Sequence, residues 1–257
     1  MQRGKTAMGH CGFFGKIPSA GDFVSHNLPP RIADTWADKM AGWMAASKKS
    51  DREAWMRQFL TSPIWRFVLP AGVIGPQAWC GLLAGSTDSV GREFPFTVLM
   101  STSIDTQRFQ PIRILDTCFD RIEERTLTFI EGQASRTDLM STLEQNSLIL
   151  DRAIAEMGTG SEQGSIAIPR PGHAAICLSR VESDDNDASI YSWPMRPGGA
   201  GTPGLCLWWH EGDQAREPEF CVSRGPLDPA AIAPFFWGDW KGHGWTRHRA
   251  LEYGAVE

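Results

Sequence analysis

Residues 65–100, WRFVLPAGVIGPQAWCGLLAGSTDSVGREFPFTVLM, contain three apolar runs separated by clusters of glycine, proline and other turn-forming residues. Aromatic and branched side chains are frequent in these runs, which is typical of strands. The runs predict strands at residues 65–69, 78–83 and 94–100. The short connections favour antiparallel pairing, because a parallel pair needs a crossover of a dozen residues or more. Pro95, early in the third run, indicates either a sheet edge or the start of a strand.

Two helices are expected before this stretch, preceded by a strand at residues 11–14. The first helix begins at Pro29-Pro30, and the second follows the capping-box pattern Ser50-Asp-Arg-Glu53. Both predicted helices carry apolar side chains at helical spacing. These side chains are Ile32, Trp36, Met40 and Trp43 in the first helix and Trp55, Phe59 and Leu60 in the second.

The C-terminal part of the sequence alternates between helical and strand patterns. Two helices are expected at residues 112–130 and 137–157. Strands are expected at residues 165–168, 174–181 and 189–193, followed by a hairpin of residues 205–209 and 219–222. Asp228-Pro229 is typical of a helix start, with an N-cap and then a proline in the first turn. The tail, residues 237–257, is aromatic, basic and irregular.

These elements together predict the α+β class: a mixed, mostly antiparallel central sheet with helices packed on it. One domain is expected over residues 10–250, after a loose N-terminal tail at residues 1–9. The glycine-rich residues 158–164 are the candidate for a subdomain break.

The composition indicates a soluble globular protein. The chain has 257 residues and a formal net charge of −5, which argues against a general nucleic-acid-binding role. No apolar run approaches the roughly 18 residues that a membrane helix needs. Residues 1–10 lack the apolar core of a secretory signal. We therefore expect a cytoplasmic protein without direct membrane insertion, and interpret its six cysteines as reduced core residues.

Motifs for catalysis and cofactor binding are sparse. The sequence has no Gly-x-Ser-x-Gly elbow, no His-Glu-x-x-His motif and no Cys/His cluster with metal-ligand spacing. Neither an enzyme nor a cofactor or metal site is expected. The alternative is a hydrolase with an unfamiliar site built from Cys11, Asp22 and His26. That alternative requires the three side chains to converge in the fold.

Two loops combine glycine and proline with opposite charges. Lys16 and Asp22 lie in the first loop, and Asp88 and Arg92 lie in the second. One interpretation is structural: Asp22 or Asp88 pairs with Arg92 and braces the turns. The other interpretation is that both loops belong to a partner-binding face, with these four residues as its candidates.

Tryptophan is unusually frequent in this sequence, with eleven residues against two tyrosines. Tryptophan rings bury a large area and also favour interfaces. One interpretation is a tryptophan-rich core. The other is that some rings face a protein partner, with Trp208, Trp209, Trp240 and Trp245 as secondary candidates.

The segment Gly12-Phe-Phe-Gly-Lys-Ile-Pro-Ser-Ala-Gly-Asp-Phe-Val24 resembles the opening motif of the TagF/ImpM family, which is associated with bacterial type VI secretion. Further matching pieces follow in family order up to residue 100. They are Leu28-Pro29, Trp36, Pro63-Ile-Trp-Arg-Phe67, Gly72-Val-Ile-Gly-Pro76, Trp79-x-Gly81 and Asp88-Ser-Val-Gly-Arg-Glu-Phe-Pro95. Residues 101–222 resemble the family in layout. Ser223-Arg-Gly-Pro-Leu227 is similar to a C-terminal Gly-Leu-Pro-type element, with the order changed.

The resemblance implies a non-enzymatic, post-translational regulator of type VI secretion, and specifically a repressor. TagF-type proteins work alongside a threonine-phosphorylation pathway with a membrane kinase, a phosphatase and a forkhead-associated (Fha) scaffold. The expected partner is therefore the Fha protein or another component, such as the membrane complex. The resemblance implies no catalytic residues. The alternative is a structural or accessory subunit of the secretion apparatus.

Overall fold

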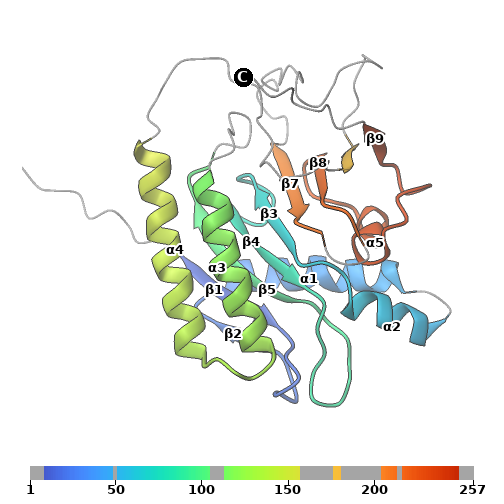
Figure 1. The fold of residues 1–257 in the computed structure, drawn as a ribbon, viewed down its shortest axis with the longest axis horizontal. Helices are drawn as coiled ribbons and strands as arrows, with labels where there is room; N and C mark the ends of the chain where they lie inside the picture. Colours follow the sequence, from blue (N-terminus) through green and yellow to red (C-terminus); the bar gives the residue numbers. More distant parts are fainter. Residues whose placement is uncertain are drawn as a thin grey trace, which may run out of the picture.

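The computed structural model describes residues 9–48, 51–104, 113–156, 176–180, 204–212 and 216–248 (Figure 1). Within these ranges, nine strands form one sheet in the order β2-β1-β5-β4-β3-β7-β8-β6-β9. The strands are β1 (Cys11–Gly15), β2 (Val24–His26), β3 (Trp65–Leu69), β4 (Ala78–Ala84), β5 (Phe96–Thr102), β6 (Ile176–Arg180), β7 (Leu205–His210), β8 (Glu219–Arg224) and β9 (Thr246–His248). Neighbouring strands pair antiparallel, except that β6 and β8 are parallel. The predicted α+β class with a mixed, mostly antiparallel sheet is confirmed.

Helices cover both faces of the sheet. On one face, α3 (Arg113–Ile130) and α4 (Arg136–Glu156) lie side by side, in front of the strands in Figure 1. On the other face pack α1 (Pro30–Ser47), α2 (Arg52–Leu60) and α5 (Pro229–Trp237). The sheet therefore separates two hydrophobic cores, one under α3 and α4 and one under α1, α2 and α5.

The central strands are buried on both sides. On β3, Phe67 packs into the core under α1, α2 and α5, and Val68 packs into the core under α3 and α4. Strands covered on both faces have nearly continuous apolar sequences, which is why composition located them. β5 begins at Phe96 and lies between β1 and β4. Pro95 therefore marks a strand start, not a sheet edge.

Arg66 joins the sheet to α3. Its buried guanidinium pairs with Asp120 at 2.7 Å and Glu123 at 3.0 Å on α3, and with Glu211 at 3.2 Å after β7. Burial alone would lower the pKa of Arg66, but the charges and hydrogen bonds of these carboxylates raise the pKa above its ordinary value. A charged strand residue is thus held beneath a helix, because three acidic partners surround it.

The first two helices confirm most of the predicted pattern. All four predicted apolar residues of α1 are buried. In α2 the N-cap is Asp51, whose side chain accepts a hydrogen bond from the Ala54 amide at 3.0 Å. The helix therefore starts one residue later than the pattern at Ser50 suggested, and Ser50 itself lies outside the described residues. Leu60 was wrongly placed on the buried face: it is 42% exposed, because the helix turns it about 100° away from the buried Phe59.

The C-terminal hairpin and helix start are confirmed. β7 and β8 pair antiparallel over six residue pairs. Asp228 caps α5 by accepting a hydrogen bond from the Ala231 amide at 3.0 Å, and Pro229 is the first helical residue. The strand predicted at residues 174–181 contains β6.

The described part of the tail is more ordered than its sequence suggested. Residues 246–248 form β9, which pairs with β6. The indole of Trp240 donates to Glu219 Oε1 at 2.8 Å, and the indole of Trp245 donates to the Ala231 carbonyl at 2.9 Å. Indole N–H groups with fixed acceptors hold this segment against β8 and α5.

Several predicted features lie outside the described residues. These are residues 1–8 of the tail predicted at 1–9, the candidate break at 158–164 and the strands at 165–168 and 189–193. The single-domain assignment stays a prediction. None of the helices in the described ranges combines the length and apolar character that a membrane crossing requires.

Candidate protein-binding site

Two loops meet at one end of the sheet because of its strand order. Residues 16–23 connect β1 to β2, and residues 85–95 connect β4 to β5. β1 pairs antiparallel with β5, so the end of β1 lies beside the start of β5. Figure 1 shows both loops at the lower edge of the view. We call these two segments the loop pair.

Gly15 allows the close approach at the base of the loop pair. Its φ is 144°, a conformation that favours glycine. A Cβ atom at this position would lie 2.2 Å from the Pro95 carbonyl oxygen. Any side chain here would therefore push the two loops apart.

Asp88 is the centre of the loop pair. Its carboxylate is fully shielded from solvent, and Oδ2 accepts from Lys16 Nζ at 2.9 Å and from Arg92 Nε at 2.7 Å. Oδ1 accepts from the backbone amides of Val90 at 3.1 Å and Arg92 at 2.9 Å. Both oxygens are thus fully used, and the carboxylate joins a residue of the first loop to the turn of the second.

The environment of Asp88 keeps it ionised. Burial would raise the pKa of this carboxyl, but hydrogen bonds from the Arg92 amide, the Lys16 ammonium, the Arg92 guanidinium and the Val90 amide together lower it well below its usual range. A carboxylate that stays ionised at neutral pH and has two cationic partners is a strong brace. The structural interpretation of these loops therefore holds for Asp88 and Arg92, and it extends to Lys16.

Direct hydrogen bonds also cross between the loops. The Ser89 amide donates to the Ala20 carbonyl at 2.9 Å. The Arg92 guanidinium donates to the Gly21 carbonyl at 2.8 Å. With the Asp88 contacts, these bonds make the two loops one unit.

The four candidate residues do not all face solvent. Lys16 and Asp88 are buried, whereas Asp22 is exposed and the Arg92 side chain is 57% exposed. The Asp22 carboxylate accepts a hydrogen bond from the Phe23 amide at 2.8 Å and takes no part in the Asp88 cluster. Lys16 and Asp88 therefore hold the loops together, and Asp22 and Arg92 are the two that a partner can reach.

Two apolar side chains project from the loop pair, and sequence reasoning did not single them out. Val90 is 71% exposed at the turn of the second loop, and Phe23 is 45% exposed in the first. The Phe23 ring stacks on Phe14 at 5.3 Å, meets Phe94 edge-on at 4.8 Å and has the Lys16 ammonium 5.0 Å from its centroid. Phe23 is thus fixed in place while one side of it stays open. The sequence feature that could have indicated Phe23 and Val90 is an apolar residue inside a loop rich in turn-forming residues.

The tryptophan candidates lie elsewhere. Trp208 and Trp209 on β7 are 1% and 3% exposed. Trp208 faces the core under α1, α2 and α5, and Trp209 faces the core under α3 and α4, where it meets Phe119 edge-on at 5.1 Å. A partner cannot contact either ring without rearranging the sheet, so these two rings are not part of the proposed contact surface. The tryptophan-rich core is the better interpretation.

Cys11, Asp22 and His26 do not converge. Cys11 is buried, and its burial, followed by the charge of Glu144, raises the pKa of the thiol to about 11. His26 lies on β2 opposite Phe13, and Asp22 is on the exposed loop. No hydrogen bond joins the three side chains, all of which are described, so this particular hydrolase site is not formed.

A second charged cluster lies where β7 ends and β8 begins, and no sequence spacing indicated it. Glu219 Oε2 accepts from His210 Nε2 at 3.0 Å and also pairs with Arg216, while Oε1 accepts from Trp240. Burial would raise the pKa of Glu219, but the hydrogen bond from His210 and the charge of Arg216 lower it. His210 and Glu219 are both buried, so the cluster fastens the tail to the hairpin.

Comparison with known proteins identifies the family. The N-terminal domain of TagF, described as type VI secretion system-associated, matches residues 12–146, more than half of the chain. The crystal structure of PA0076 from Pseudomonas aeruginosa PAO1, at 2.05 Å resolution, is similar with a TM-score of 0.59 and 23% sequence identity. The likeness covers 95% of this chain and 99% of that one, and it shows a shared fold. No curated protein sequence matches. The family match includes the whole loop pair and confirms the resemblance of the opening motif: the chain belongs to the TagF family of type VI secretion system-associated proteins.

Proposed function

We propose that this protein is a non-enzymatic, post-translational repressor of type VI secretion that acts in the cytoplasm by binding a protein partner through the loop pair. Family membership supports the link to secretion. One structural observation supports the binding surface: a buried, fully bonded Asp88 locks two loops that hold Phe23 and Val90 out to solvent. A preorganised surface loses little conformational freedom on binding, which favours affinity.

The proposed contact has an apolar centre and a charged rim. Phe23 and Val90 supply the apolar contact, and Asp22 and Arg92 supply opposite charges beside it. Interfaces commonly combine a desolvated apolar anchor with surrounding polar groups. We propose the Fha scaffold as the partner, with another component of the phosphorylation pathway or of the membrane complex as the alternative. Repression then follows from covering a partner surface that assembly requires.

Val90→Asp tests the surface. Val90 is highly exposed, so the substitution places a charge in the proposed contact and leaves the fold intact. We expect capture of the Fha protein in a pull-down to fall at least tenfold. Leu148→Asp is the matched control, because Leu148 is 54% exposed on α4 and lies outside the loop pair. Equal capture by wild type and Val90→Asp would remove the loop pair from the Fha interface.

Deletion of the gene tests whether the protein represses secretion or is required for it. A repressor predicts increased release of the secretion tube protein into the medium when the gene is deleted. A structural or accessory subunit predicts loss of release. Lost release would contradict the repressor proposal.

A further inference from the structure

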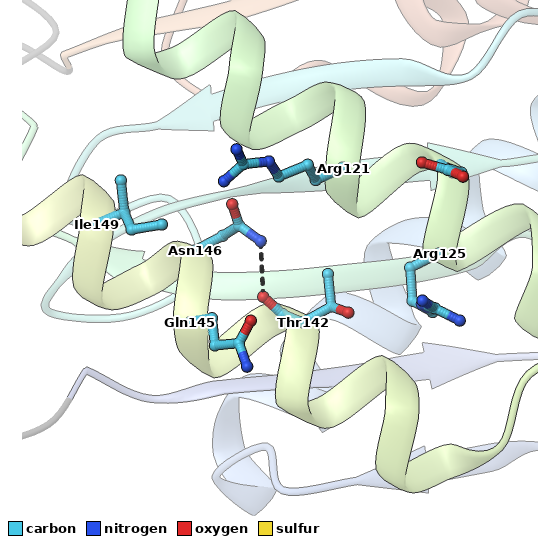
Figure 2. Close-up of a pocket in the computed structure, with 7 residues that line it drawn as sticks. Arg121, Arg125, Thr142, Gln145, Asn146 and Ile149 are labelled. Atoms are coloured by element: carbon cyan, nitrogen blue, oxygen red, sulfur yellow. Dashed lines mark hydrogen bonds between the residues drawn. The ribbon is translucent and has the colours of Figure 1, made fainter.

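A second candidate site lies in the cleft between α3 and α4 (Figure 2). The cleft has a volume of about 200 Å³ and is lined by Arg121, Glu124 and Arg125 from α3 and by residues that include Thr142 and Asn146 from α4. Spacings of three and four residues place each set on one helix face. The neighbouring faces of two packed helices thus bring polar side chains together on the α3–α4 side of the sheet.

Asn146 is the unusual residue in this cleft. It is 3% exposed, and its Nδ2 donates to the Thr142 carbonyl at 2.8 Å. Its Oδ1 is buried and has no hydrogen-bond partner. In Figure 2 this oxygen points away from Thr142, toward the side of the cleft that holds the Arg121 guanidinium. A buried acceptor without a partner is destabilising, so its presence requires an explanation. A ligand that donates a hydrogen bond supplies one.

The two arginines give the cleft a positive charge. Arg121 is exposed, Arg125 is half-buried, and neither makes an ion pair within the described part of the chain. Glu124 is the acidic residue among those lining the cleft, so the lining carries two cationic groups and one carboxylate. Guanidinium groups match the oxygens of carboxylates and phosphates, which they bind with paired hydrogen bonds.

The size of the cleft limits its occupant. Pockets for whole small molecules commonly have volumes of about 300–1,000 Å³. A volume of about 200 Å³ suits one side chain of a larger partner. That side chain must be anionic to satisfy the arginines, and a hydrogen-bond donor must lie beside it to satisfy Asn146. A peptide supplies both, because every residue except proline carries a backbone N–H next to its side chain.

We propose that the α3–α4 cleft binds an anionic side chain of a partner peptide, either a carboxylate or a phosphate. Arg121, whose guanidinium lies on the side toward which Asn146 Oδ1 points, donates hydrogen bonds to the oxygens of this side chain, Arg125 adds positive charge at the other end of the cleft, and an adjacent backbone N–H donates to Asn146 Oδ1. The cleft is separate from the loop pair, so this site goes beyond the proposed function and stands or falls independently of it.

The test is a titration in which small probes are added to the full chain and binding is monitored by the amide chemical shifts in ¹H–¹⁵N NMR spectra. The probes are N-acetyl-glutamate N′-methylamide, its phosphothreonine counterpart and its neutral glutamine counterpart. We expect the anionic probes to shift amides of α3 and α4 around the cleft, and the glutamine probe to shift none. Arg121→Ala should raise the Kd at least tenfold, and Arg125→Ala should raise it by a smaller factor, because the Arg125 guanidinium lies at the other end of the cleft. The anionic probe that binds more tightly shows whether the cleft prefers a carboxylate or a phosphate side chain.

Three further comparisons make the test specific. Arg152→Ala removes an exposed arginine of α4 outside the cleft and should leave the Kd unchanged. Val90→Asp should also bind the probes like wild type. Asn146→Leu should weaken the glutamate probe at least threefold and leave the Kd of propionate, a carboxylate without an amide, unchanged. Equal binding of the glutamine probe, unchanged Kd values in both arginine variants, or an equal effect of Asn146→Leu on glutamate probe and propionate would each overturn the proposal.

Discussion

The loop pair and the α3–α4 cleft each bury a polar side chain, but they treat it in opposite ways. In the loop pair, both oxygens of Asp88 accept hydrogen bonds from backbone amides or cationic groups. In the cleft, the oxygen of Asn146 has no partner, while two arginines nearby have no ion pair among the described residues. The first arrangement is complete within the chain. The second is completed by a group from outside it.

This difference separates structural from functional polar groups. A buried carboxylate whose bonds are all made stabilises the fold and leaves nothing for a ligand. We therefore propose that the functional part of the loop pair is its exposed surface, with Phe23 and Val90 as the apolar contact and Asp22 and Arg92 at its rim, and not the buried Lys16 and Asp88. In the cleft the polar groups themselves carry the function.

The largest effect is expected from Asp88→Leu. The substitution leaves the buried Lys16 ammonium and the amides of Val90 and Arg92 without their acceptor, and such uncompensated groups are strongly destabilising. We expect the Tm to fall by roughly 10 °C, measured by circular dichroism. Asp22→Leu, at the exposed carboxylate of the same loop pair, should change the Tm little. A Tm for Asp88→Leu close to that of wild type would mean that Asp88 is not the brace.

The pH dependence of the free energy of unfolding should also reflect the ionisation of Asp88. Because the folded pKa of Asp88 is lowered, the unfolded chain takes up a proton at acidic pH that the folded chain does not. The contribution of the ionised Asp88 carboxylate to the free energy of unfolding is fully present above about pH 5. It is lost progressively as the pH falls below about 4, the pKa of an aspartate in the unfolded chain. We expect the difference in unfolding free energy between wild type and Asp88→Asn to narrow from pH 5 to pH 3, measured with urea. A constant difference across this range would contradict the assignment.

At the other site, Asn146→Leu should act in the opposite direction. Leucine removes the buried oxygen that lacks a partner and fills a similar volume. We expect the free energy of unfolding to rise by about 1 kcal/mol, measured by urea denaturation. A loss of stability as large as that of Asp88→Leu would show that Asn146 is satisfied within the chain, and the contrast between the two regions would disappear.

The smallest effect on stability is expected for Val90→Asp. A substitution at an exposed position without fixed contacts changes the free energy of unfolding by less than about 0.5 kcal/mol. The same urea measurement checks this value. A larger loss would mean that Val90 supports the fold, and that reduced binding by the variant does not report on an interface.

The sequence predicted those features that depend on residues close together in the chain. Three β-rich runs, the capping motif at Asp228 and the possibility that Asp88 pairs with Arg92 all depend on residues a few positions apart, and the structure confirms them. The sequence did not predict the pairing of Lys16 with Asp88. These residues are 72 positions apart and meet only because β1 lies beside β5.

Contacts between distant elements explain the remaining differences. Arg66 lies inside a predicted strand, and its burial depends on acidic residues that α3 brings over the sheet. The cleft could not be inferred, because Arg121 and Asn146 become neighbours only when α3 packs against α4. Trp208 and Trp209 were secondary candidates for an interface, and the structure favours the core interpretation because helices cover both faces of the sheet.

The most direct test of the central claim is tube-protein release from a strain in which Val90→Asp replaces the wild-type gene, with Leu148→Asp as the control. If the loop pair is the repressing surface, the Val90→Asp strain releases tube protein at the raised level of the deletion strain, while the Leu148→Asp strain stays at the wild-type level. Release at the wild-type level from a Val90→Asp strain that produces normal amounts of folded protein would contradict the claim.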